Sequence, residues 1–94
     1  MSNSTLFLMQ AEYSKSAYLL EQLQHMADPS TDQIVLMAES ALLYNDPSLN
    51  NYHCYILKND ADILPESIGS HIQIIDYSEF SQILLQHTRC ISLK

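Results

Sequence analysis

Glycine is nearly absent from this chain, whose 94 residues include one glycine, Gly69. Dinucleotide-binding and P-loop turns need several glycines directly after a strand, because the backbone there must approach a phosphate group closely. Gly69 instead precedes an apolar segment. The sequence therefore excludes nucleotide-binding functions of these two types.

Basic residues are also scarce. Four Lys and Arg residues stand against eleven Asp and Glu residues, which gives a formal net charge of −7. A surface of this sign repels a phosphate backbone, so we expect no direct binding of nucleic acid. An acidic surface suits a basic protein partner, although an acidic surface that is merely solvated is the simpler interpretation.

Long apolar segments and basic leader residues are missing as well. The apolar run near the start, Leu6 to Met9, is shorter than the roughly 7–15 residues of a signal-peptide core. No run approaches the about 20 residues of a membrane-spanning helix. The two cysteines, Cys54 and Cys90, lie far apart in the sequence. We therefore expect a cytoplasmic protein with reduced thiols and no membrane attachment.

Five short apolar runs predict the strands of a sheet. Runs of about 4–8 apolar or β-branched residues bounded by turn residues are typical of strands that are buried on both faces. The runs are Thr5–Met9, Gln33–Met37, Tyr52–Leu57, Ile72–Ile75 and Cys90–Leu93, the last being a short edge strand. Helical patterns separate most of them, so residues 1–94 predict one small domain of alternating strands and helices.

The first and last helices have the clearest signals. Lys15–Ala27 carries a stripe of apolar residues and follows Ser14, a candidate N-cap. In the last helix Asp76 can accept hydrogen bonds from the first turn while Glu79 reaches back, which predicts a capping box. The residues that fall on one apolar face of that helix are Phe80, Ile83, Leu84 and His87.

The helical patterns in the middle of the chain are short. They cover Ala38–Tyr44 and Ala61–Leu64, with Asn59 or Asp60 as the cap of the second, and a turn over 65–69 follows. These elements predict a three-layer α/β/α domain with a four- or five-stranded, mainly parallel sheet. Because such short helices cannot cover a sheet fully, we expect part of its apolar surface to be buried against another chain.

Acidic residues and histidines offer weak signals for a site. Glu39, Asp60 and Asp76 follow three strands, and carboxylates at these ends of a parallel sheet could hold Mg²⁺. The simpler interpretation is that the two aspartates cap helices and that Glu39 faces solvent. The histidines have no metal-ligand spacing, and they are His25, His53, His71 and His87. We predict no catalytic, cofactor or metal site from these residues.

The two cysteines are the remaining candidates. Cys54 lies in the middle of a predicted strand, where an inert buried thiol is expected, and neighbouring His53 points to the opposite face. Cys90 follows Arg89, and a neighbouring cation could lower the pKa of its thiol. The simpler interpretation of Cys90 is a small residue on an edge strand.

Two segments resemble one known family. Ile74–Phe80 (IIDYSEF), followed by an apolar helix that ends at His87, resembles the C-terminal signature of the TusB/DsrH family, which reads roughly I-D-Y-x-x-F. Tyr55–Asp60 (YILKND) is similar to the family's Y-x-L-x-x-D pattern. The resemblance extends over nearly the whole chain, and its C-terminal third is the specific part.

Three positions depart from the family's pattern. Leu6–Leu8 stands where members usually carry a Leu-His-Thr-like segment, and Glu39-Ser40 stands where Asp-Gly is usual. The first helix holds no cysteine, whereas some members have one there and others do not. These departures point away from a sulfur-carrying role for this chain.

The resemblance implies a non-catalytic or accessory subunit of a sulfur relay. Such chains assemble with homologous TusC-like and TusD-like chains into a heterohexamer, which passes persulfide sulfur toward 2-thiolation of the tRNA wobble uridine or serves dissimilatory sulfur oxidation. The transferring cysteine then belongs to the TusD-like chain, and another protein meets the tRNA. The alternative is an active persulfide carrier that uses Cys90 or, less favoured, Cys54. Self-association of the isolated chain stays open.

Overall fold

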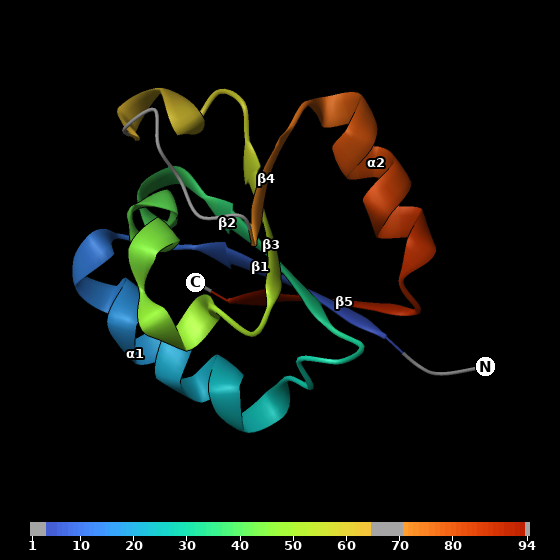
Figure 1. The fold of residues 1–94 in the computed structure, drawn as a ribbon, viewed down its shortest axis with the longest axis horizontal. Coiled ribbons are helices and arrows are strands. Elements are labelled where there is room, and N and C mark those ends of the chain that lie inside the picture. The colour runs from blue at the N-terminus through green and yellow to red at the C-terminus, as the bar shows by residue number, and fades with distance from the viewer. Residues whose placement is uncertain (1–3, 65–70, 94) are drawn as a thin grey trace.

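A five-stranded parallel sheet forms the centre of the molecule (Figure 1). The computed structural model describes residues 4–64 and 71–93, so the predicted turn over 65–69 lies outside them. The strands are β1 (Thr5–Gln10), β2 (Gln33–Met37), β3 (His53–Leu57), β4 (Ile72–Ile75) and β5 (Arg89–Leu93). Their order is β4-β3-β2-β1-β5, and each neighbouring pair is parallel, which confirms the predicted sheet.

Helices of very different length connect these strands. They are α1 (Tyr13–Met26), the 3₁₀ helices η1 (Ala38–Asn45), η2 (Pro47–Leu49) and η3 (Ala61–Ile63), and α2 (Tyr77–Gln86). The helices after β2 and β3 are therefore short, as the sequence predicts. Among these described helices, none has the length and apolarity that crossing a membrane requires.

One face of the sheet carries a thick layer of helices. Its core contains strand residues such as Phe7, Ile34 and Ile56, which pack against leucines of α1. Residues of η1, η2 and η3 complete this cluster: Ala41, Leu43, Leu49 and Ala61. Figure 1 shows α1 and the green segment of η1 and η2 on this side of the sheet. We call it the α1 face.

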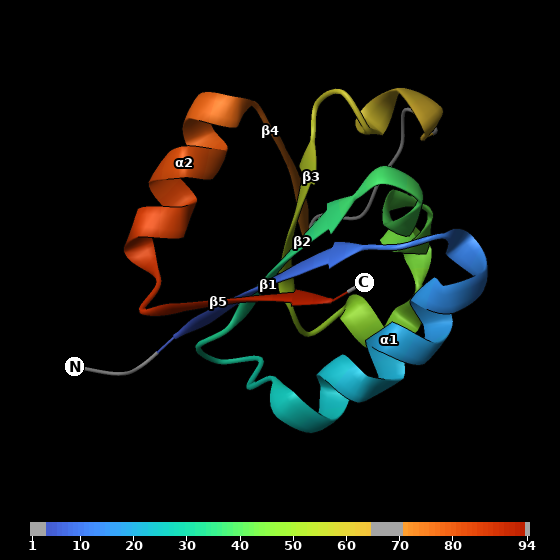
Figure 2. The same cartoon turned by 180° about the vertical axis from the view of Figure 1, so that it is seen from behind.

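The opposite face, which we call the α2 face, is covered among the described elements by α2 alone. Ile83 of α2 packs on a second buried cluster that contains Leu6, Val35, Tyr55, Leu57 and Ile75. Alternate residues of a strand point to opposite faces, so this cluster and the first share the same strands without mixing. Figure 2 shows α1 and α2 on opposite sides of the sheet, which confirms the three-layer arrangement.

The capping predictions had mixed outcomes. The Asp76 carboxylate accepts from the Glu79 N–H at 2.8 Å and the Glu79 carboxylate accepts from the Asp76 N–H at 3.2 Å, which confirms the capping box. Ser14 as N-cap is wrong, because α1 begins at Tyr13 and its N-cap is Glu12, whose side chain makes no capping bond. Asp60 occupies the N-cap position of η3, but its side chain makes no capping bond, so that prediction is also wrong.

Two buried polar contacts hold the loops of the α1 face together. The Asp32 carboxylate accepts from the N–H of Thr5 and from the N–H of Asp28, both at 2.9 Å, and thereby joins the start of β1 to the loop before β2. The Ser16 and Ser40 hydroxyl groups lie 3.1 Å apart and join α1 to η1. These bonds pair buried polar groups, which would destabilise the fold if they had no hydrogen-bond partner.

Candidate functional site

The two free thiols lie on opposite faces of the sheet, since Cys54 belongs to the cluster of the α1 face and Cys90 pairs with Leu6 of the α2 face. Cys54 on β3 is fully buried in the cluster of the α1 face, and its Sγ donates to the Tyr52 carbonyl at 3.8 Å. Burial raises the pKa of the Cys54 thiol from 9.0 to about 12. Because the thiolate is the reactive form, this group is inert at neutral pH.

Cys90 is exposed on the edge strand β5, paired with Leu6 of β1. The expectation that Arg89 lowers the pKa of this thiol is wrong, since burial of the thiol raises it instead. Arg89 and Cys90 are consecutive strand residues that point to opposite faces. The Arg89 guanidinium donates through Nε to Thr5 Oγ1 at 3.3 Å, so it is bound to β1 and directed away from the Cys90 thiol.

The structure does not bring the acidic candidates together. Within residues 4–64 and 71–93, no group of three or more His, Cys, Asp or Glu side chains could hold a metal ion. Asp76 instead caps α2, as the simpler interpretation held. Asp60 and Glu39 belong to the turns after β3 and β2, on the elements that cover the α1 face. The Mg²⁺ hypothesis based on Glu39, Asp60 and Asp76 is therefore wrong.

The histidines likewise form no catalytic group in the described residues. The His53 ring lies 4.7 Å from the Tyr55 ring, on the face opposite to Cys54, as the strand alternation predicts. His87 ends α2, and its Nδ1 lies 2.9 Å from the Ile83 carbonyl, so it is a packed histidine. The buried Nε2 of His71 has no hydrogen-bond partner among the described residues.

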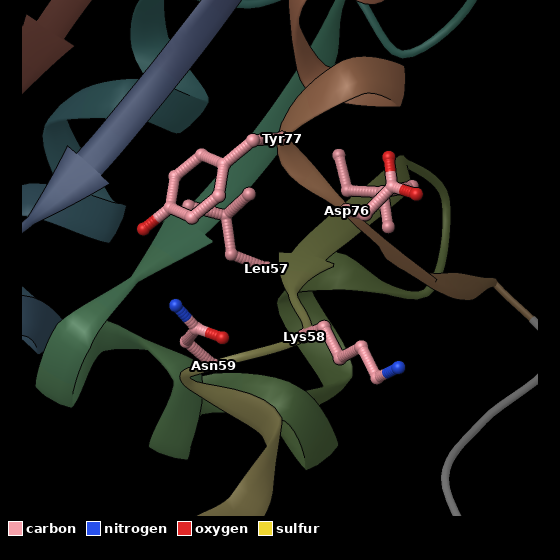
Figure 3. A pocket seen from close by; sticks show the side chains of 6 residues that line it. Leu57, Lys58, Asn59, Asp76 and Tyr77 are labelled. Carbon is pink, nitrogen blue, oxygen red and sulfur yellow. The ribbon is translucent and has the colours of Figure 1, made fainter.

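A small pocket of about 70 Å³ lies where β3 and β4 end and α2 begins (Figure 3). Its floor is apolar, and polar groups form its rim. The lining residues are Leu57, Lys58, Asn59, Ile75, Asp76 and Tyr77. The parallel pairing of β3 with β4 places these two sequence segments side by side, with the Lys58 N–H donating to the Ile75 carbonyl at 2.8 Å.

The rim of this pocket is suited to contacts more than to chemistry. Figure 3 shows the Tyr77 and Asn59 side chains on one side of the pocket and the Lys58 and Asp76 side chains on the other. The Asp76 carboxylate is already engaged in the helix cap. No acid and base face each other across the pocket, so the arrangement can hold an apolar group and offer hydrogen bonds around it.

The sequence alone does not predict this pocket. Its residues lie at the carboxyl ends of two neighbouring parallel strands, the usual position of ligand sites in open α/β sheets. The strand order, which the sequence does not contain, decides that Leu57–Asn59 and Ile75–Tyr77 meet. Tyr77 belongs to the family-like segment Ile74–Phe80, and its 61% exposure is the further signal that the structure adds.

Comparison with known proteins places the fold. No known protein-family model matches the chain, and no curated protein sequence matches it. Among solved structures, it is similar to the ychN protein from E. coli, with a TM-score of 0.64 and 12% sequence identity. The match covers 99% of this chain and 100% of that chain. The two proteins share the same fold over their whole length.

Proposed function

We propose that this chain is a non-catalytic or accessory subunit of a TusBCD- or DsrEFH-like sulfur-relay complex. In the cytoplasm, the complex would transfer persulfide sulfur toward 2-thiolation of the tRNA wobble uridine. The observation that carries this proposal is the DsrE-like fold over the full chain, combined with the TusB/DsrH-like segment Ile74–Phe80. TusC-like and TusD-like chains are the proposed partners in a heterohexamer.

The roles of the signature residues support an accessory function. Asp76 caps α2, while Ile75 and Phe80 pack on the α2 face. A signature made of a cap and packing positions preserves a fold and a surface and supplies no reactive group. The buried Cys54, whose thiol has a raised pKa, agrees with this interpretation.

The test is co-expression with homologous TusC-like and TusD-like chains, followed by purification through a tag on this chain. We expect a stoichiometric complex in size-exclusion chromatography with light scattering. A stable monomer that leaves both other chains behind would contradict the proposed function. The tRNA branch is tested separately, since deletion of the chain should lower the content of 2-thiolated wobble uridine.

The alternative function is an active persulfide carrier that uses Cys90. The exposure of Cys90 favours it over Cys54 as the acceptor. The Cys90 thiolate would attack the terminal sulfur of a donor protein's persulfide, the donor's S–S bond would break, and the donor cysteine would leave as a thiolate. This step transfers one sulfur atom without net oxidation.

Intact mass spectrometry distinguishes the two functions. The chain is incubated with a cysteine desulfurase and cysteine, with a TusD-like chain in the same mixture as an internal acceptor. We expect the added sulfur atom on the TusD-like chain and none on this chain. An added sulfur atom on this chain that disappears in Cys90→Ser would support the carrier function instead.

A further inference from the structure

The outer flank of α2 exposes large apolar side chains to solvent. Leu85 is 86% exposed and Tyr77 is 61% exposed. Together with Ser81 and the half-buried Leu84, they follow at i, i+4, i+7 and i+8, so they share one side of the helix. We call these four residues the α2 stripe. Leu84 also packs against the core cluster of the α2 face, whereas Tyr77 and Leu85 are exposed to solvent.

The composition of α2 differs from that of an ordinary surface helix. A helix that packs one face on a core usually presents charged residues on the opposite face. Among its ten residues, Tyr77–Gln86, Glu79 alone is charged. The cores of protein interfaces are depleted of charge and enriched in aromatic side chains. The outer side of α2 thus has the composition of a binding surface.

The pocket extends this surface at its N-terminal end. Tyr77 belongs both to the α2 stripe and to the pocket lining, while Leu57 and Ile75 form the apolar floor. An exposed tyrosine beside a small pocket is typical of the anchors that dominate binding energy, because its ring packs while its hydroxyl group hydrogen-bonds. One ligand could contact the stripe and fill the pocket together.

The charges around the pocket indicate the character of that ligand. Asp76 lies on its rim, and Glu79 is three residues further along α2. Lys58 is the one basic residue in the pocket lining. The chain as a whole carries a net charge of −7. Charge complementarity therefore favours a basic ligand.

We propose that the α2 stripe and its pocket dock a basic, amphipathic segment of a partner protein. An apolar side chain of that segment enters the pocket, and its Lys or Arg residues face Asp76 and Glu79. The inference rests on the proposed function in one respect, since it takes the partner to be another chain of the assembly. It adds which surface is used and the charge that the partner carries.

The first experiment uses the co-expressed TusC-like and TusD-like chains with Tyr77→Ala and Leu85→Ser variants. Tyr18→Ala is the matched control, because Tyr18 on α1 is 62% exposed. Truncating an interface anchor should weaken the complex about tenfold or more, whereas the control should bind like wild type. Circular dichroism melts check that all three variants remain folded.

The second experiment uses a defined probe, a synthetic amphipathic helix with leucines on one face and lysines on the other, against a copy with glutamates in place of lysines. We expect the lysine peptide to bind more tightly, to shift the NMR signals of Tyr77 and Leu85, and to weaken as salt is added. Tyr77→Ala should reduce this binding and Tyr18→Ala should not.

The outcomes separate the two proposals. A complex with the homologous chains that survives both α2 substitutions overturns the docking surface and leaves the proposed function standing. If no such complex forms but the lysine peptide binds α2, the proposed function fails and the docking surface stands. Equal binding of both peptides, or binding of neither, overturns the basic character of the partner.

Discussion

The two faces of the sheet differ in how completely helices cover them. On the α1 face, four helical elements cover the strands and bury Phe7, Leu23 and Cys54. On the α2 face, one ten-residue helix among the described elements covers the same strands, and Leu8 and Met37 remain half-buried. The stability of the isolated chain should therefore depend mainly on the α1 face, and its recognition of other proteins on the α2 face.

The strand order explains this asymmetry. From β1 to β4 the sheet grows in one direction by one neighbour at a time, and all three connections contribute residues to the cluster of the α1 face. The step from β4 to β5 crosses back over three strands, and its helix packs on the other face. In a parallel sheet, a reversal of direction changes the face that a right-handed crossover occupies. A single reversal leaves a single helix on the α2 face.

The two thiols provide the largest expected contrast between the faces. At neutral pH, a thiol reagent should modify Cys90 within the mixing time, while Cys54 should react only when the core opens. Cys54 is fully buried, so a reagent reaches its thiol only after substantial unfolding. We therefore expect Cys54 to react roughly 10³-fold more slowly than Cys90. Absorbance of the released leaving group follows both phases.

Single substitutions assign the two phases. Cys90→Ser should remove the fast phase and leave the slow one, and Cys54→Ala should do the opposite. Comparable rates for the two cysteines in the folded wild-type chain would refute the difference in burial on which the comparison rests.

The core substitutions give the next largest contrast. Leu23→Ala removes a fully buried side chain from the α1 face and should lower the free energy of unfolding by about 3 kcal/mol. Leu84→Ala removes the same atoms from a half-buried site on α2, and we expect a loss of about 1 kcal/mol. Urea unfolding measures both, and equal losses would show that the two faces contribute alike.

Alkaline pH gives a third test of the α1 face. Burial raises the pKa of Cys54 from 9.0 to about 12, so the folded chain keeps a proton that the unfolded chain loses near pH 9. The unfolded state then binds fewer protons, and stability falls as the pH rises from about 9 towards 12. Between pH 8 and pH 10, we expect wild type to lose about 1 kcal/mol more than Cys54→Ala.

Cys90→Ala is the control for this pH dependence. Burial also raises the pKa of Cys90, but its side chain is exposed, so its removal should change the pH dependence less. Urea unfolding at several pH values supplies the data. A wild-type curve parallel to that of Cys54→Ala through this range would mean that Cys54 is not held in its neutral form.

Much of the fold could be predicted from the sequence because the strand signal is strong. All five strands appear within a residue or so of their predicted bounds, as in Gln33–Met37 for β2. The runs are apolar on both sides since both faces of a parallel sheet are covered to some degree. The pocket could not be predicted, because it depends on β3 lying beside β4.

Local charge and capping were less predictable, for two physical reasons. Arg89 is next to Cys90 in the sequence, but its side chain lies on the other face of the sheet. The guanidinium is therefore not placed to lower the pKa of the Cys90 thiol. Ser14 precedes the apolar stripe of α1, yet the backbone turns into the helix before that stripe begins. A capping box needs two specific residues at a fixed spacing, so the pair Asp76 and Glu79 is a specific signal that the structure confirms.

The helix caps give the smallest expected contrast. Asp76→Ala removes the acceptor of the Glu79 N–H and should destabilise the chain by about 1 kcal/mol. Glu12→Ala is the matched change at the start of α1, where the side chain makes no cap, so we expect an effect close to zero. Both are measured by urea unfolding at pH 7. Ile83 is the one buried residue of α2, so the helix cap should also matter for order in that helix. Hydrogen exchange in α2 should rise in Asp76→Ala while exchange in α1 stays unchanged. Faster exchange in both helices would mean that α2 and the α1 face unfold as one unit. Assigning stability mainly to the α1 face and recognition to the α2 face would then be wrong.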